Sequence, residues 1–134
     1  MERKAEPIVF TTTDPLGRKV LLKRDTWLSH IRAKHGEDII TEETIKKNIE
    51  DPIYITQNLK PAYDGSKELV IDSRRQDYWD VVPGNEHFFL LKTIVEFETE
   101  NEGKVVTTYL LTKMKEMRTT GGIIYDRKQN KSTN

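Results

Sequence analysis

The chain has 134 residues, of which 35% are hydrophobic and 33% are charged, so it can bury one core and fits a single domain. It contains no cysteine, which excludes disulfide bonds, thiolate zinc ligands and a cysteine nucleophile. Basic and acidic residues balance at 22 each, so the net charge predicts neither a nucleic-acid partner nor an acidic one. The polar N-terminal segment lacks the apolar stretch of a signal peptide, and no apolar run reaches the roughly 20 residues that cross a bilayer.

The first expected element in chain order is an antiparallel hairpin. Residues 8–12 alternate between apolar and polar side chains, as strands do. The motif DPLG at 14–17 is typical of a tight turn, because proline presets φ and a glycine follows. Residues 18–23 then return as the second strand. Residues 1–6 are expected to be a flexible N-terminus.

Two helices are expected next. Asp25 is a suitable N-cap for a helix that runs to about His35, with Gly36 in the C-cap position. Thr41 is a suitable N-cap for a second helix that ends where an Asp-Pro pair disfavours the α conformation. Helical periodicity directs one stripe of apolar residues toward the sheet: Trp27, Leu28, Ile31, Ile45 and Ile49.

The rest of the chain has the two-residue period of strands. Strands are expected at 53–56, 68–72, 77–82, 87–98, 104–115 and 121–125, with a polar loop at 58–66. The two longest strands should pair directly through the turn ENEG at 100–103. The expected fold is therefore α+β: an N-terminal hairpin, then two helices packed on one face of an antiparallel β-sheet. It forms a single domain over 7–125, followed by a disordered tail at 126–134.

Charge is segregated along the chain. Residues 18–35 contain six basic residues and one acid, a net charge of +5. Residues 37–51 contain six acids and two lysines, a net charge of −4. A basic face could bind phosphates, but the same pattern also fits two ordinary solvated faces.

The first expected helix carries two of the three histidines. At about 100° per residue, His35 falls within the apolar stripe and His30 falls at its edge, beside Lys34. A histidine in such a stripe is either buried with its hydrogen bonds satisfied or reaches a cleft, where it can act as acid or base. The i, i+5 spacing does not put both rings on one helix face, so they are poor co-ligands for a metal.

The strand VVTTY at 105–109 is the second candidate for chemistry. Strict alternation puts Thr107 and Tyr109 on one face with Val105, and Thr108 on the other. Tyr109 and Lys113 could bind phosphate or stack on a base, or they could form an amphipathic rim pair. The alternative for the threonines is plain strand propensity.

Five segments in this order resemble a known family: HIRAKHGE (30–37), IEDPIYI (49–55), DYWDVV (77–82), FLLKTIVEF (89–97) and VVTTY (105–109). The set resembles the phage-associated branch of the barnase–EndoU–colicin–RelE-like (BECR) nuclease superfamily over about residues 25 to 115.

The resemblance implies a metal-independent endoribonuclease of the toxin or phage-effector type, with no cofactor. Such enzymes cut RNA by attack of the ribose 2′-OH on the adjacent phosphate, which needs an acid, a base and groups that neutralise phosphate charge. The residues implied as catalytic are His30, His35, Thr108 and Tyr109. The residues implied to bind substrate are Arg32, Lys34, Thr107 and Lys113.

The resemblance also implies partners and a place of action. The substrate is RNA, with tRNA as one candidate, and a cognate inhibitor or immunity protein is a further expected partner. The site of action is the cytoplasm, with delivery or carriage by a phage and no membrane partner. The alternative is a non-catalytic binding module of the same fold, immunity-like or a phage accessory protein. Its support is the neutral net charge and the acidic second helix, which could dock a basic partner.

Overall fold

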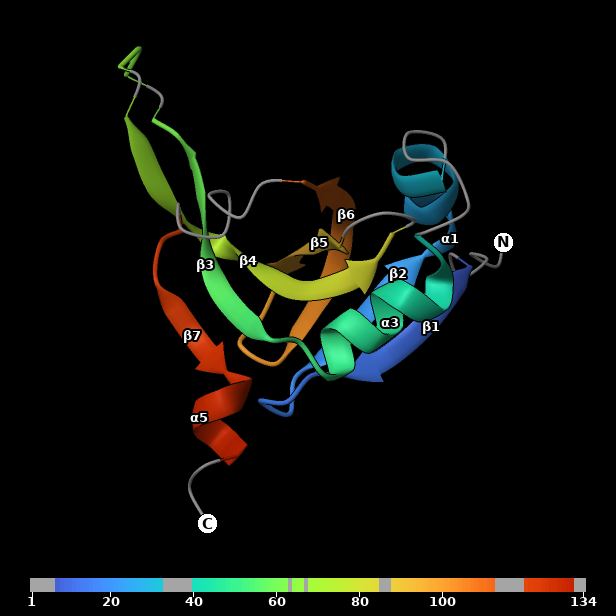
Figure 1. Ribbon diagram of the computed structural model, residues 1–134. Coiled ribbons are helices and arrows are strands. Elements are labelled where there is room, and N and C mark those ends of the chain that lie inside the picture. Colours follow the sequence, from blue (N-terminus) through green and yellow to red (C-terminus); the bar gives the residue numbers. More distant parts are fainter. Residues whose placement is uncertain are drawn as a thin grey trace, which may run out of the picture.

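The computed structural model of the protein describes residues 7–32, 40–62, 64–66, 68–84, 88–112 and 120–131, with only the backbone of residues 30, 32, 130 and 131. Its elements, in chain order, are β1 (Ile8–Thr13), β2 (Lys19–Lys23), α1 (Arg24–Thr26), η1 (Trp27–Arg32), α3 (Glu42–Glu50), β3 (Tyr54–Pro61), β4 (Leu69–Pro83), β5 (Phe88–Phe97), β6 (Glu102–Leu111), β7 (Ile123–Asp126) and α5 (Arg127–Lys131). Seven strands form one curved sheet in the order β1-β2-β6-β5-β4-β3-β7, and α3 packs against it (Figure 1).

The expected fold class is wrong in two respects. The sheet is mixed rather than antiparallel, because β2 pairs in parallel with the start of β6, Lys19–Leu21 against Glu102–Lys104. The helices in the described part of the chain are short, so the predicted pair of regular helices packed on one face of the sheet is not found there. The hairpin joins the edge of a strand that lies about 80 residues further along the chain. Local periodicity carries no information about that long-range pairing.

The N-terminal hairpin is confirmed. β1 and β2 pair antiparallel, with Thr13 opposite Lys19. The DPLG turn is held by Asp14, whose Oδ1 accepts from the backbone N–H of Leu16 at 3.0 Å and of Arg18 at 2.9 Å. A positive φ of 82° is taken by Gly17, which has no Cβ to oppose it.

The first expected helix differs from its prediction. It begins at Arg24 with no side-chain cap, so Asp25 is not the N-cap, and after one turn it becomes the π-helix η1. A π-helix closes i→i+5 hydrogen bonds, so side chains are spaced differently around its axis than at 100° per residue. Ile31 is fully buried as expected, whereas Leu28 is 40% exposed. The expected C-cap, Gly36, lies outside the described residues.

The second helix follows its prediction closely. The Thr41 side chain caps α3 by accepting from the N–H of Thr44 at 3.1 Å. Ile45 and Ile49 are both fully buried against the sheet. We call the sheet face that packs on α3 the inner face and the opposite face the outer face.

The central strands are longer than expected. The predicted loop at 58–66 begins as strand, because β3 continues to Pro61 and pairs with β4, Leu59 opposite Ile71. The two strands expected at 68–72 and 77–82 are one strand, β4, which has a bulge between its two pairings with β3. The β3–β4 ribbon therefore projects beyond the rest of the sheet as an arm (Figure 1).

β5 and β6 pair directly and antiparallel, as expected, but a bulge changes the phase of β6. The register shifts between Ile94 and Val95, so that Ile94 faces Thr107 and Val95 faces Val105. Val105 consequently joins the inner-face core with Thr108, whereas strict alternation placed these two residues on opposite faces. A bulge inserts one residue and shifts the alternation on one side of it.

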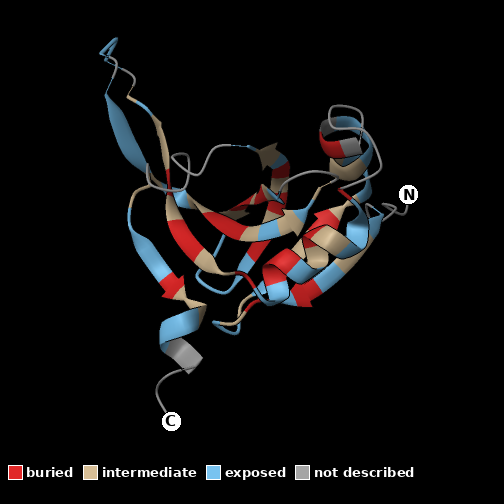
Figure 2. Ribbon diagram, viewed as in Figure 1, coloured by how far each residue is buried: buried red, intermediate tan, exposed pale blue. Residues whose placement is uncertain are grey.

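The hydrophobic core lies between α3, η1 and the inner face of the sheet (Figure 2). Its fully buried members include Val20, Leu22, Ile31, Ile45, Ile49, Ile55, Tyr78 and Val95. β7 forms the edge beside β3, and residues 127–131, predicted to belong to a disordered tail, form the helix α5. No helix in the described part of the chain is long and apolar enough to cross a membrane.

Candidate functional site

Polar and aromatic side chains gather on the outer face of β4, β5 and β6. In the register of these antiparallel strands, Trp79 pairs with Lys92 and Lys92 pairs with Tyr109. Two residues further along β5, Asp77 and Thr107 both pair with Ile94. Directly paired residues share one face of a sheet, so these side chains form a continuous patch. We call this set the outer-face cluster: Asp77, Trp79, Lys92, Thr107 and Tyr109.

Lys92 is held at the centre of the cluster by an anion and an aromatic ring. Its Nζ lies 3.8 Å from Oδ2 of Asp77 and 5.3 Å from the centroid of the Trp79 ring. The Trp79 ring is itself fixed, because its Nε1 donates to Oγ1 of Thr56 at 2.9 Å and the residue is fully buried. The lysine side chain keeps 24% of its surface exposed, so its ammonium group is oriented but accessible.

Asp77 lies beneath this lysine and is nearly inaccessible, with 2% of its surface exposed. Its Oδ1 accepts from Nδ2 of Asn58 at 2.8 Å, and Asn58 is also buried. Burial raises the pKa of Asp77 above its ordinary value, while the charge of Lys92 and the Asn58 hydrogen bond act in the opposite direction. A buried carboxylate that lost its lysine would be unpaired at high cost, so the two side chains hold each other in place.

Tyr109 gives the cluster an accessible aromatic group. It is 37% exposed and lies next to Lys92 on the neighbouring strand, whereas Thr107 is 9% exposed. A cation beside an exposed ring can bind a phosphate and stack on a nucleobase. The tyrosine and threonine hydroxyls add hydrogen-bond donors. The patch therefore has the groups that recognise a nucleotide.

Thr108 is placed away from this patch. It lies fully buried on the inner face, and its Oγ1 donates to Oγ1 of Thr93 at 3.3 Å. Thr93 in turn accepts from Nδ2 of Asn48 on α3 at 2.8 Å, and the same amide donates to the backbone oxygen of Tyr78. Thr108 thus belongs to a buried network that ties α3 to the sheet, and it is separated from Thr107 and Tyr109 by the sheet itself.

The helix with the first histidine lies beside the strand of the cluster. β2 pairs with β6 only as far as Lys104, and the chain then turns into α1 and η1, both of which contact β6. The backbone of His30 and Arg32 is therefore close to β6, while Ile31 between them anchors η1 in the core. Lys34, His35 and Lys113 lie outside the described residues.

Sequence reasoning missed Lys92 and Asp77, although both leave a signal in the sequence. Lys92 is the only basic residue in the strand FFLLKTIVEF, and Asp77 begins the apolar and aromatic run DYWDVV. A charge inside an apolar strand is costly to bury unless it has a partner, so such residues predict a paired or functional group. Their pairing across β4 and β5 could not be read from local pattern.

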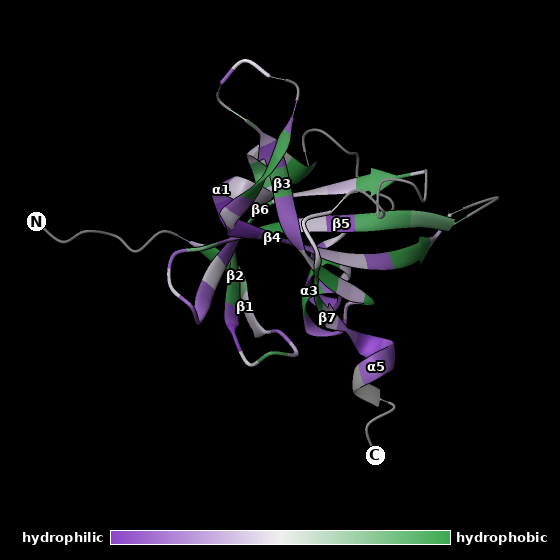
Figure 3. Ribbon diagram, turned by 90° about the vertical axis from the view of Figure 1, so that its left-hand side faces the viewer, coloured by the Kyte–Doolittle hydropathy of each residue, from purple (hydrophilic) through white to green (hydrophobic). Residues whose placement is uncertain are grey.

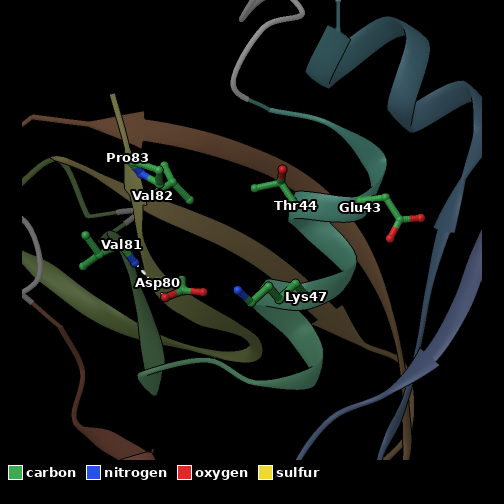
Figure 4. A pocket seen from close by; sticks show the side chains of 7 residues that line it. All are labelled: Glu43, Thr44, Lys47, Asp80, Val81, Val82 and Pro83. Atoms are coloured by element: carbon green, nitrogen blue, oxygen red, sulfur yellow. Dashed lines mark hydrogen bonds between the residues drawn. The ribbon is translucent and has the colours of Figure 1, made fainter. Parts of the chain in front are cut away.

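A recess lies on the inner-face side of β4, between this strand and α3 (Figure 4). Its volume is about 640 Å³, and Lys47 and Asp80 point toward each other across it. Burial raises the pKa of Asp80, whose Oδ1 accepts from the N–H of Val81 at 2.8 Å. None of the residues that the sequence predicted to be functional lines this recess.

No group of three or more histidine, aspartate or glutamate side chains is arranged to hold a metal ion among the residues that the structure describes. Comparison of the chain with models of known protein families, with curated proteins and with solved structures finds no match. The case for a function therefore rests on the side chains of the outer-face cluster.

Proposed function

We propose that the protein is a metal-independent endoribonuclease that cuts RNA by attack of the ribose 2′-OH on the adjacent phosphate. The observation that carries the proposal is the oriented ammonium group of Lys92, held by Asp77 and Trp79 and flanked by the exposed ring of Tyr109. The cluster lies on the outer face of β4, β5 and β6, and the helix with His30 contacts β6 from the side of the inner face.

The reaction needs groups that stabilise a phosphorane with extra negative charge. A cation that is already in place at the phosphate contributes more than one that must be ordered during the reaction. Lys92 fits this role, because Asp77 and the Trp79 ring restrict the position of its ammonium group. Asp77 is buried behind the lysine and acts as a positioning residue rather than a group that touches RNA.

The reaction also needs an acid and a base, and histidine is the side chain that titrates near neutral pH. The resemblance assigns one of these roles to His30, whose helix η1 contacts β6 and packs on the inner face. The proposal keeps His35 as the second acid–base group, with Arg32, Lys34 and Lys113 as cations near the phosphates. Tyr109 stacks on a base and Thr107 donates its hydroxyl. Because Thr108 is fully buried on the other face, it has no direct part in the proposed chemistry.

The proposed substrate is single-stranded or loop RNA, including tRNA, because a protein ring can stack only on a base that is not already paired and stacked. A cognate inhibitor that covers the outer-face cluster would protect the producing cell. The proposed site of action is accordingly the cytoplasm, where the RNA is.

The test is cleavage of total RNA and of tRNA, with EDTA present, across pH 5 to 8. We expect discrete fragments from the wild-type protein, and a loss of roughly 10²–10³ in rate for Lys92→Met, the size of effect seen when one pre-organised charge-stabilising group is removed. His30→Ala should lose roughly 10²–10⁴. The matched control is Lys104→Met, a lysine on β6 that pairs with Glu98 at 3.2 Å outside the cluster, which should leave the rate unchanged.

The outcomes distinguish a ribonuclease from a non-catalytic binding module, and they test whether the outer-face cluster is the site. If the wild-type protein leaves RNA intact over this pH range, the non-catalytic binding module replaces the ribonuclease. If cleavage occurs and Lys92→Met cuts as fast as Lys104→Met, the outer-face cluster is not the site. Circular dichroism of each variant separates a lost function from a lost fold.

A further inference from the structure

Asn58 is a buried polar residue within β3, at a position where strand propensity does not favour it. Asparagine is depleted in strands, because its side chain competes with the backbone for hydrogen bonds. Both β3 and β4 have hydrophilic segments between hydrophobic ones (Figure 3). Asn58 is 6% exposed, and its Nδ2 donates to Oδ1 of Asp77 on β4 at 2.8 Å. A buried amide is costly unless it is hydrogen-bonded, so the contact with Asp77 is what makes asparagine tolerable here.

A bulge in β4 lies opposite Asn58. Its neighbours Gln57 and Leu59 both pair with β4, but the register shifts between them, so Asn58 itself has no partner in the β3–β4 register. The side chain of Gln57 closes the bulge, since its Nε2 donates to two backbone oxygens of β4 at 2.7 Å and 3.2 Å. Bulges re-aim side chains and are frequent beside active sites. At this bulge, the amide that lacks a register partner is directed to Asp77.

The strand β3 supports both of the groups that hold Lys92. Thr56, two residues before Asn58, accepts from Nε1 of Trp79 at 2.9 Å. Trp79 and Asp77 on β4 in turn flank the ammonium group of Lys92 on β5. The contacts therefore run in one direction across three neighbouring strands, from β3 through β4 to the lysine on β5.

We propose that Asn58 is a positioning residue for Lys92 and acts through Asp77. This inference rests on the proposed function, in which Lys92 stabilises the phosphorane. An aspartate carboxylate turns easily about its last torsion. The hydrogen bond from Asn58 to Oδ1 fixes that torsion, so that Oδ2 stays toward Nζ of Lys92, 3.8 Å away. The same hydrogen bond favours the ionised carboxylate, which is the form that attracts the lysine.

Asp77 needs this support because its surroundings oppose ionisation. Burial raises the pKa of Asp77, and the charge of Asp72 raises it further, whereas Lys92 and the Asn58 hydrogen bond lower it. Lys92 on β5 and Asp72 on β4 are the charged side chains that act on Asp77, and β3 contributes the neutral amide. A hydrogen bond to a charged group corresponds to about 1–2 pH units of pKa. Without the amide, the pKa of Asp77 should rise by that amount.

The first measurement does not depend on ribonuclease activity. In isotope-labelled protein, NMR follows the titration of the Asp77 carboxyl carbon and the response of the Lys92 side chain to the charge on Asp77. Asn58→Leu is similar in size but lacks the donor, and it should move both curves to higher pH by about 1–2 units. Asn58→Asp keeps the shape of the side chain and places a second carboxylate beside Asp77, which should also move them upward.

The matched control is Asn48→Leu. Asn48 is likewise a buried asparagine, but its amide donates to Thr93 and to the backbone oxygen of Tyr78, away from the outer-face cluster. This variant should lose stability and leave both NMR curves in place. A merely structural role for Asn58 predicts the same result for Asn58→Leu, so the comparison separates positioning from packing.

The second measurement is the pH profile of RNA cleavage. In Asn58→Leu the acid limb of the profile should move upward with the pKa of Asp77. In the Asp77→Asn background, Asn58→Leu should have no further effect on the rate, because a residue that acts through another loses its influence when that residue is changed.

The proposal is supported if both NMR curves move in the two Asn58 variants and stay in place in Asn48→Leu. It is overturned if the Asp77 titration does not move, if the Lys92 signals do not follow Asp77, or if RNA is cut and the acid limb is unchanged in Asn58→Leu. A wild-type protein that leaves RNA intact overturns the proposed function instead. The NMR curves then still decide whether Asn58 positions Lys92.

Discussion

Ile31 is the residue that ties the histidine-bearing helix to the sheet. It is fully buried in the core between η1 and the inner face. Ile31→Ala removes three carbon groups, worth about 2.4 kcal/mol at about 0.8 kcal/mol each, and leaves a cavity as well. The total loss in the free energy of unfolding should be about 2–5 kcal/mol. At about 2.1 cal/mol/K per residue over the 134 residues, a loss of about 3 kcal/mol lowers Tm by roughly 10 °C.

The assay is urea denaturation followed by circular dichroism, with a thermal melt of the same samples. Leu28→Ala is the matched control, because Leu28 lies three residues earlier on the same helix and is 40% exposed. It should cost less than about 1 kcal/mol, as surface substitutions do. Equal losses for the two variants, or a loss below about 0.5 kcal/mol for Ile31→Ala, would refute the packing of η1 described above.

Two further predictions concern the sheet. Burial raises the pKa of Asp77 in the folded state, so its contribution to stability is fully present below about pH 3.8 and is lost as pH rises through the folded-state pKa. Asp77→Asn should therefore reduce the fall in Tm between about pH 4 and pH 7; an unchanged fall would show that Asp77 does not titrate abnormally. Gly103→Ala should destabilise by about 1–3 kcal/mol, measured by urea titration, because its Cβ would lie 2.7 Å from Cγ1 of Val95 and 2.9 Å from the Phe97 ring. If Gly103→Ala were as stable as the wild type, the packing of Val95 and Phe97 around Gly103 would be less tight than the structure shows.

Several elements could be predicted from short stretches of sequence. The hairpin follows from the DPLG turn, since Asp14 and Gly17 act within four residues of each other. The second helix follows from the Thr41 cap and the four-residue spacing of its buried isoleucines. These features depend on hydrogen bonds and periodicities over a few residues, which local pattern records faithfully.

Two of the five residues of the outer-face cluster could be predicted in the same way. VVTTY indicated that Thr107 and Tyr109 share a face, and Tyr109 does lie in the outer-face cluster with Thr107. The bulge in β6 altered which valine shares that face, because a bulge depends on how β5 fits against β6 rather than on either strand alone. The importance of Lys92 and Asp77 emerges only once β4 and β5 are in register.

The sequence by itself determined where the N-terminal hairpin, the second helix and the β5–β6 pair form, because these depend on propensity, turns and capping within a few residues. Tertiary structure alone decided that β2 joins β6 in parallel, that the first helix winds as a π-helix, and that β3 and β4 run on into an arm. Each of these depends on contacts between residues far apart in the chain. Their free energy comes from burial and pairing that no short segment can achieve alone.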